Sequence, residues 1–439
     1  MWFKKINFII YPQYIYIVHS IFSFSFVLLN TTSLSQRNKL KILNDPIYGF
    51  ITIPNARLFD IIEHKYFQRL RRISQMGVSF LVYPGAHHTR FHHALGCMHL
   101  MQKAVRVLRF KGVAISDAEA EALQIAILLH DIGHGPFSHA MEHSIVSGVN
   151  HERISELFME KMNADFNQSL TLAISIFKGH YDRHFMHQLI SSQLDMDRLD
   201  YLKRDSFYTG VSEGNINSER LIAMLNVVDD QLVVEHKGIY SVEKFLVARR
   251  LMYWQVYLHK TSLGAEQLMI RVLKRAKELT DKGEILNCNK PLLYFLENRI
   301  TEDKFNDDIL NTFAELDDYD VISAMKQWMH HDDFVLSELC KMIINRDLLK
   351  VKLKKREVSK EKIEKQINLL MSRYDISAHE ASYFVFSGSV ENLAYKIKAN
   401  PINILHKNGK ITDVVKASDQ LNLKALSKVV KKYFWCYPK

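Results

Sequence analysis

The chain contains little cysteine, proline or glycine. Its 439 residues include only four cysteines, eight prolines and 16 glycines. The cysteines stand far apart, without a CxxC pair, at Cys97, Cys288, Cys340 and Cys436. This spacing excludes a disulfide framework and a zinc knuckle, and it fits a reducing cytosol. With few helix-breaking residues and long periodic stretches, the chain is predicted to be mainly helical.

Length and composition indicate a soluble protein with more than one domain. A chain of 439 residues exceeds one ordinary core, so we expect two or three domains. Its hydrophobic share of 47% and charged share of 24% are typical of globular proteins. The net charge of +10 suits a protein that handles polyanions such as nucleotides or nucleic acid. Solvated lysine-rich helices explain the charge almost as well, so charge alone does not identify a partner.

The first thirty residues allow two interpretations. Residues 6–29 form an uncharged, largely apolar run that is long enough to span a bilayer or to act as an uncleaved signal. The run contains Pro12, Gln13 and His19 and has no clear small-residue cleavage site. We favour a start codon assigned too early over a real membrane anchor. The folded protein is therefore expected to begin near Lys39 and to be cytoplasmic, with a membrane as partner only if the run is an anchor.

The predicted fold class is mainly α, a helical domain with a few short hairpins and a smaller α+β C-terminal module. Expected boundaries are an extension at 1–38, the main domain at 39–285 and the module at 286–439. Apolar periodicity predicts helices at 56–76, 118–130, 152–162, 185–200, 218–227 and 242–279, and Thr89 is expected to cap a further helix. Hairpins are expected at 42–55 and at 233–242, the latter turning at Lys237-Gly238. The lysine-rich run 350–365 is expected to be a solvated face, with an oligomer or nucleic-acid contact as the alternative.

Histidine is the unusual residue of this chain. Ten of its 21 histidines fall between His87 and His151. Neutral imidazole is the commonest metal ligand in proteins. The clustering therefore indicates metal chemistry in this part of the chain.

The run LLHDIGHGPFSH, residues 128–139, carries the strongest signal. An apolar helix ends in the adjacent pair His130 and Asp131, which can both reach one divalent ion. The glycine-rich turn that follows lets a substrate approach the backbone. An isolated His-Asp pair means little, but HDIGHG with histidines on both sides is far more specific.

Two other segments are expected to complete a ligand shell. TRFHHALG, residues 89–96, places His92 and His93 at the start of a helix, and His93 is the better-placed ligand. LDMDRLDYLKRD, residues 194–205, offers four carboxylates in a helical frame, of which Asp197 and Asp200 share a face, and one of the four would complete the site. Asp195 and Asp200 are expected on the helix surface or in salt bridges. His87, His88, His92 and His99 are expected at the surface or behind the ligands.

Together these blocks resemble the HD-domain phosphohydrolases. Within that superfamily the chain is most similar to the deoxynucleotide (dGTP-type) triphosphohydrolases, including the vertebrate type that joins a sterile-alpha-motif to an HD domain. The resemblance covers roughly residues 40–280 and extends to PIYG at 46–49, FQRLRRISQMG at 67–77, PGAHHTRF at 84–91 and NHE at 150–152. The sterile-alpha-motif is absent.

The resemblance implies roles for individual residues. Metal ligands would be His93, His130, Asp131 and Asp197. Catalytic or phosphate-side positions would be His134, His139, His151 and Glu152. Substrate-binding positions would be Gln75 near the deoxyribose, Arg90 and Arg198 at the phosphates, Tyr201 under the sugar, Asp205 at the 3′-hydroxyl and, less securely, Arg249, Tyr257 and Lys260 on a helix that closes the pocket.

The implied reaction is hydrolysis of a deoxynucleoside triphosphate to a deoxynucleoside and inorganic triphosphate. One divalent ion, which Mn, Mg, Fe or Zn fits equally, would activate water, and His139 or His151 would protonate the 5′-oxygen. One alternative keeps the metal site for another phosphoester, as in a nucleotidase or phosphodiesterase. Another is a nucleotide- or nucleic-acid-binding protein with a degenerate site.

Relatives of this type form oligomers, so a homo-oligomer is expected. Some of them hold a nucleotide activator between subunits. Gln68 and Arg71 match such a site, but Glu63 stands where those relatives have an aspartate. Allosteric control is therefore left open.

Overall fold

The computed structural model describes residues 41–137, 144, 146, 148–397, 400–419 and 423–439. Helices predominate, as the sequence predicted. The helices of the first half are α2 (Ala56–Glu63), α3 (Lys65–Gln68), α4 (Arg90–Phe110), α5 (Asp117–Leu129), α7 (His151–Asp165), α8 (Thr171–Phe177), α9 (His184–Ile190), α10 (Met196–Thr209) and α11 (Ser218–Ala223). Those of the second half are α12 (Ile239–Met252), α13 (Lys260–Asp281), α14 (Lys290–Glu297), α15 (Asp307–Ala314), α16 (Asp318–Trp328), α17 (Phe334–Ile344), α18 (Lys360–Tyr374), α19 (Ala378–Ser382), α20 (Val414–Ala417) and α21 (Leu423–Leu426).

Three small sheets accompany the helices. Strands β1 (Lys41–Asp45) and β2 (Gly49–Ile53) form the hairpin expected at 42–55. A four-stranded sheet has the order β3 (Leu225–Val228), β4 (Gln231–Glu235), β7 (Asn403–Leu405) and β8 (Ile411–Asp413). A three-stranded antiparallel sheet has the order β5 (Lys350–Lys354), β9 (Val430–Tyr437) and β6 (Phe386–Asn392).

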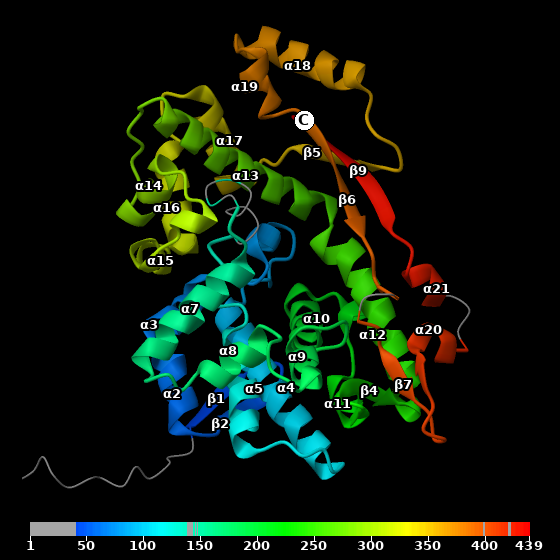
Figure 1. Cartoon of the computed structure of the whole chain (residues 1–439). Helices are drawn as coiled ribbons and strands as arrows, with labels where there is room; N and C mark the ends of the chain where they lie inside the picture. Colours follow the sequence, from blue (N-terminus) through cyan, green and yellow to red (C-terminus); the bar gives the residue numbers. More distant parts are fainter. Residues whose placement is uncertain (1–40, 138–143, 145, 147, 398–399, 420–422) are drawn as a thin grey trace, which may run out of the picture.

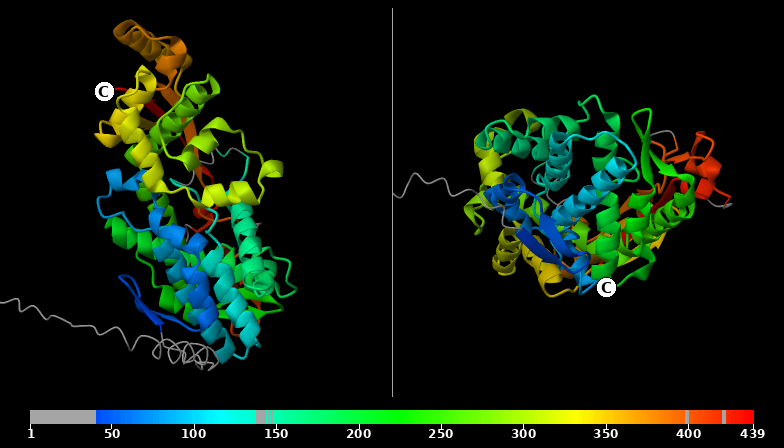
Figure 2. Two further views of the ribbon diagram at one scale, coloured as in Figure 1. Left: turned by 90° about the vertical axis from the view of Figure 1, so that its left-hand side faces the viewer. Right: turned by 90° about the horizontal axis from the view of Figure 1, so that it is seen from below.

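Helices α4, α5 and α10 form the centre of the helical part, and α7, α8 and α9 lie around them (Figure 1). Thr89 caps α4 in a box with His92, and Ser116 caps α5 in a box with Glu119. Both caps satisfy backbone N–H groups that a helix start leaves unpaired. The molecule is elongated, with α18 and α19 at one end and the β1–β2 hairpin at the other (Figure 2).

The C-terminal segment packs onto the main domain at two places. Strand β7 pairs in parallel with β4, with Ile404 opposite Val234. The β5–β9–β6 sheet lies against α13, where a Cβ at Gly264 would come within 2.6 Å of Val351. The expected boundary at 285–286 stays a prediction, because the described residues form one continuous core across it.

Several expected elements are wrong in detail. The helix expected at 185–200 is two helices, because Asp195 folds back as the N-cap of α10 and accepts from the backbone N–H of Arg198 at 2.7 Å. The helix expected at 242–279 is interrupted by a π-helical turn at Tyr253–Tyr257. The hairpin turns at Asp229 and Asp230, both with positive φ, whereas Lys237-Gly238 lies in a 3-10 turn. The run 350–365 begins as strand β5 before α18 starts.

No helix of the described residues is long and apolar enough to cross a membrane. The interpretation of residues 6–29 falls outside the part of the chain that the structure describes, so the choice between a mis-assigned start and an anchor stays a prediction.

Replacing Glu119 with Gln should lower the free energy of unfolding by about 2 kcal/mol at pH 7. Burial alone would raise the pKa of Glu119, but bonds from the Ser116 backbone (2.7 Å), Arg183 (2.9 Å) and Tyr181 (2.9 Å) outweigh it and lower the pKa from 4.5 to about 2. A lowered carboxyl pKa stabilises the fold above pH 4.5, and this contribution disappears as the pH falls toward 2. Urea denaturation measures the change.

Asp117 is the matched control, since its side chain lies in the same first turn but is 99% exposed. Asp117→Asn should change stability by less than about 0.5 kcal/mol. Equal losses in both variants would contradict the assignment to the buried network.

Candidate active site

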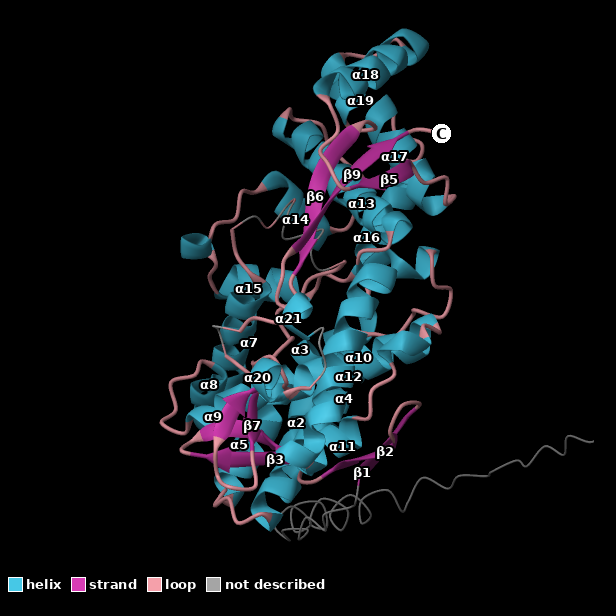
Figure 3. Ribbon diagram, turned by 90° about the vertical axis from the view of Figure 1, so that its right-hand side faces the viewer, coloured by secondary structure: helices cyan, strands magenta, loops and turns pink. Residues whose placement is uncertain are grey.

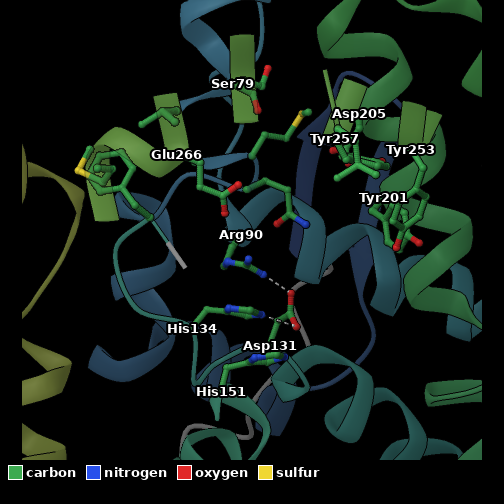
Figure 4. Close-up of a pocket in the computed structure, with 18 of the residues that line it drawn as sticks. Ser79, Arg90, Asp131, His134, His151, Tyr201, Asp205, Tyr253, Tyr257 and Glu266 are labelled. Carbon is green, nitrogen blue, oxygen red and sulfur yellow. Dashed lines mark hydrogen bonds and ion pairs between the residues drawn. The ribbon is translucent and has the colours of Figure 1, made fainter. Parts of the chain in front are cut away.

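A cavity of about 610 Å³ lies where the start of α4, the end of α5, the start of α7 and α10 come together, with α13 and the π-helical turn closing its far wall. Figure 4 shows side chains from all of these elements pointing into it. Ten residues proposed from the sequence line this cavity: Gln75, Arg90, Asp131, His134, His151, Asp197, Arg198, Tyr201, Asp205 and Tyr257.

The four expected metal ligands lie together at the base of the cavity. His93 Nε2 is 3.1 Å from Asp197 Oδ1 and 3.8 Å from Asp131 Oδ2. His130 Nε2 is 3.5 Å from the same Asp197 oxygen and 3.6 Å from Asp131 Oδ1. Ligand atoms held about 2.1 Å from one ion lie roughly 3–3.5 Å from one another, so the separations suit a shared divalent ion.

Hydrogen bonds behind the two histidines turn the correct nitrogens toward the cluster. His93 Nδ1 lies 2.7 Å from Asp200 Oδ2, and His130 Nδ1 lies 2.7 Å from the Ile127 carbonyl oxygen. With an ion bound, each Nδ1 would carry the proton and each Nε2 would offer its lone pair to the ion. His130 Nε2 is buried without a hydrogen-bond partner. These residues fit a divalent metal ion.

Cys97 also lies beside this cluster, one helical turn after His93, with its Sγ 3.5 Å from His93 Nδ1. Burial raises the pKa of the Cys97 thiol, although the nearby His93 opposes this effect. The Cys97 Sγ is nearly equidistant from His93 Nδ1 (3.5 Å) and Nε2 (3.6 Å), so it lies beside the ring and not in the direction of the Nε2 lone pair. Asp131 as the fourth ligand stays a prediction.

Asp131 also belongs to a second group, with His134 and His151. Its Oδ1 is 3.3 Å from His134 Nε2, and its Oδ2 accepts from Arg90 (Figure 4). The rings of His134 and His151 stack with centroids 3.9 Å apart. Burial and the Arg90 charge lower the pKa of His134 to about 3, so its imidazole is neutral at physiological pH.

Polar and aromatic side chains form the other end of the cavity. Asp205 lies between His88 Nε2 and the Tyr257 hydroxyl, each 2.7 Å from one of its carboxylate oxygens. The Tyr201 and Tyr257 rings meet edge to face at 6.1 Å. Gln75 Oε1 is buried there without a hydrogen-bond partner. This end thus offers one carboxylate and two rings to a ligand.

Some proposed residues lie elsewhere. Glu152 is exposed on α7, outside the cavity lining. Arg249 is half-buried near Tyr201. Burial raises the pKa of Tyr201, and the positive charge of Arg249 opposes this rise. Lys260 lines a different cleft. His139 falls outside the described residues. The roles assigned to all four stay predictions.

For Asp195 and Asp200, behind the cavity, the salt-bridge alternative is confirmed and the surface alternative is wrong. Asp195 and Asp200 are fully buried rather than on the surface, although both do form salt bridges. Arg69 was not proposed at all. It is buried among carbonyl groups and donates to the backbone oxygens of Ile132 (3.2 Å) and His134 (2.7 Å). Arg69 therefore fixes the turn that carries the His-Asp pair, and no spacing rule could have found it.

The pocket also contains residues that sequence reasoning missed. Ser79, Tyr253, Ser262 and Glu266 line it, from the 3-10 turn after Met76, the π-helical turn and α13. Figure 4 shows the Glu266 carboxylate directed into the cavity. Helical periodicity gave no signal for them, because the interruption before α13 was not expected.

Comparisons with known proteins agree with this site. A family profile described as HD domain matches residues 90–205, and one described as HD associated region matches residues 216–290. The uncharacterized protein YwfO of Bacillus subtilis is 32% identical over 399 residues, which are 86% of this chain and 88% of that protein. The deoxynucleoside triphosphate triphosphohydrolase SAMHD1 homolog of Dictyostelium discoideum is 31% identical over 61% of this chain and 57% of its own length.

A solved structure extends the likeness to nearly the whole chain. A phosphohydrolase from Bacteroides thetaiotaomicron superposes with a TM-score of 0.89 at 52% sequence identity, over 91% of this chain and 100% of that one. The matched HD profile contains α4, the His130-Asp131 pair and α10 as far as Asp205. The chain belongs to the HD-domain family of metal-dependent phosphohydrolases.

Proposed function

We propose that the protein hydrolyses deoxynucleoside triphosphates to a deoxynucleoside and inorganic triphosphate. The observation that carries this proposal is the two-ended cavity. The His/Asp cluster with Arg90 lies at one end, and Asp205 with Tyr201 and Tyr257 lies at the other. A sugar packed beside these two tyrosines would present a hydroxyl to Asp205 and direct its phosphates toward the cluster. The triphosphohydrolase relatives are consistent with this substrate class.

The residues divide the work in this proposal. A divalent ion at His93, His130, Asp131 and Asp197 would supply an activated water and offset phosphate charge. Arg90 and Arg198 add fixed positive charge for the phosphate oxygens. The neutral imidazole of His134 would hold Asp131 in place by hydrogen bonding. Either His151, which stacks on His134, or His139 would donate the proton to the leaving 5′-oxygen.

A product assay tests the function. Protein supplied with Mn²⁺ is incubated with each of the four deoxynucleoside triphosphates, with GTP and with a cyclic dinucleotide, and inorganic triphosphate is measured by ion chromatography. We expect triphosphate from at least one deoxynucleotide and none after EDTA treatment. Release of pyrophosphate or monophosphate instead would contradict the proposed cleavage at the α-phosphate, and turnover of the cyclic dinucleotide alone would favour another phosphoester as substrate.

Asp205→Asn should lower kcat/KM for a deoxynucleoside triphosphate about 10- to 100-fold. An ionised acceptor for the sugar hydroxyl contributes about 1.5–3 kcal/mol, and the amide replaces one oxygen with a donor. A 2′,3′-dideoxy substrate is the matched control, because it lacks the hydroxyl and the substitution should then cost little. The same loss with both substrates would contradict a hydroxyl contact at Asp205.

A further inference from the structure

The outer face of the β5–β9–β6 sheet carries a regular array of lysines and aromatic rings. Its register pairs Lys350 with Tyr437, Lys352 with Trp435 and Lys354 with Tyr433. Directly paired residues of an antiparallel sheet point to the same side. These six residues therefore form one surface, the aromatic–lysine face. On the other side of β9, the register partners are the small residues Ser387 and Ser389.

The opposite face of the sheet is the one that the fold uses. Phe434, Cys436 and Phe386 are buried there, and Arg271 of α13 lies 3.1 Å from the centre of the Phe386 ring. Figure 3 shows the three strands in front of α13. Packing onto α13 thus explains the inner residues. On the aromatic–lysine face Trp435 is also buried, whereas Tyr433 and Tyr437 stay partly exposed.

Within the face, the lysines lie over the rings instead of pairing with acids. Lys352 Nζ is 5.8 Å from the Trp435 ring and 5.5 Å from the Tyr437 ring, and Lys354 Nζ is 5.8 Å from Trp435. None of the three lysines forms an ion pair with a carboxylate of the described residues. The Trp435 and Tyr437 rings lie 4.3 Å apart. Trp435 is 8% exposed, and its indole N–H has no hydrogen-bond partner.

A cationic cleft continues from this face. Its cavity of about 500 Å³ is lined by Lys260, Arg346, Lys350, Lys352 and Lys439, and by no acidic side chain. The nearest neutralising contact is Asp347, which lies 3.1 Å from Lys439 at the surface. The cleft and the face share Lys350 and Lys352, so one negatively charged polymer could bind along both.

We propose that the aromatic–lysine face and this cleft bind single-stranded nucleic acid. Phosphates would lie along the lysines, and unpaired bases would stack on the partly exposed rings of Tyr433 and Tyr437. Sheet faces with aromatic rings beside a positively charged groove recognise single strands in this way, because every base offers a flat surface. This site is separate from the active-site cavity and does not depend on the proposed reaction.

Fluorescence anisotropy with a labelled thymidine oligonucleotide of about 20 nucleotides tests the proposal on the full chain. The wild type should bind at low salt, with log Kd rising by about 0.7 for each phosphate neutralised per tenfold increase in salt. The triple variant Lys350→Gln/Lys352→Gln/Lys354→Gln should weaken binding at least about tenfold and lower the salt slope by about 2. The double variant Tyr433→Ala/Tyr437→Ala should weaken it about tenfold with an unchanged slope.

Matched controls come from α18, which belongs to the same lysine-rich segment. Lys360, Lys362 and Lys365 are exposed there, and their triple replacement by Gln removes the same charge. Tyr374 on the same helix is 43% exposed and controls for loss of an aromatic ring. Neither control should change affinity more than about twofold, and thermal melting confirms that each variant is folded.

Three results would overturn the proposal. They are no binding by the wild type, equal weakening by the sheet and α18 triple variants, or a sheet variant that changes the mass measured by light scattering but not oligonucleotide binding. The last result would identify the face as a contact between copies of this chain.

Discussion

Replacing Asp131 with Ala should reduce kcat/KM for phosphoester hydrolysis at least about a thousandfold. Asp131 lies between His130 on one side and the pair His134 and Arg90 on the other. Its Oδ1 lies 3.6 Å from His130 Nε2 and 3.3 Å from His134 Nε2, and its Oδ2 accepts from Arg90. The substitution therefore removes a proposed metal ligand and also releases Arg90, the proposed phosphate contact. Steady-state kinetics over a range of Mn²⁺ concentrations measures the loss.

Cys97→Ala is the informative control for this variant. The thiol lies as close to His93 and His130 as a ligand would, but burial keeps it protonated. Metal affinity, measured by competition with a fluorescent chelator, should fall about 100-fold or more in Asp131→Ala and stay within about twofold in Cys97→Ala. The reverse order would assign the fourth ligand to Cys97 and make Asp131 a phosphate-side residue.

The sequence predicted the residues at the centre of the site better than the residues that hold them in place. His93, His130, Asp131 and Asp197 were proposed from the family resemblance. In the structure His93, His130 and Asp197 form one group, and Asp131 lies 3.6–3.8 Å from the two histidines. Asp200 and Arg69 hold that cluster in place, yet both act through contacts between segments far apart in the chain. A buried carboxylate and an exposed one look alike in sequence when each occupies the same helical period.

The helices of the fold were also predicted with uneven success. The capped helices α4 and α5 were predicted closely, because a Thr or Ser cap precedes a continuous apolar pattern. The expected helix at 242–279 failed, since neither Gly nor Pro marks the π-helical turn at Tyr253–Tyr257. That turn carries Tyr253 and Tyr257 into the cavity. The local sequence pattern thus did not reveal a distortion of the helix that lies at the pocket.

Asp200→Asn should destabilise the protein by about 3 kcal/mol and weaken metal binding about 10- to 100-fold. Asp200 is fully buried between the metal ligand His93 and the guanidinium of Arg204, whose Nε lies 2.8 Å away. Burial works against its charge, but Arg204 and the bond from His93 outweigh this and lower its pKa to about 2. An amide cannot neutralise Arg204, which keeps only Asp45 at 2.8 Å.

The metal effect has a separate cause, the orientation of His93. With carboxylate at Asp200, Nδ1–H donates and Nε2 faces the ion; with an amide, the ring is free to turn or to change tautomer. Asp333→Asn is the matched control, because it breaks a partly buried pair with Arg275 away from the site. It should lower the free energy of unfolding by a comparable amount and leave metal affinity within about twofold. If both variants lose metal affinity in proportion to stability, Asp200 acts only through the fold, and the proposed orientation of His93 is wrong.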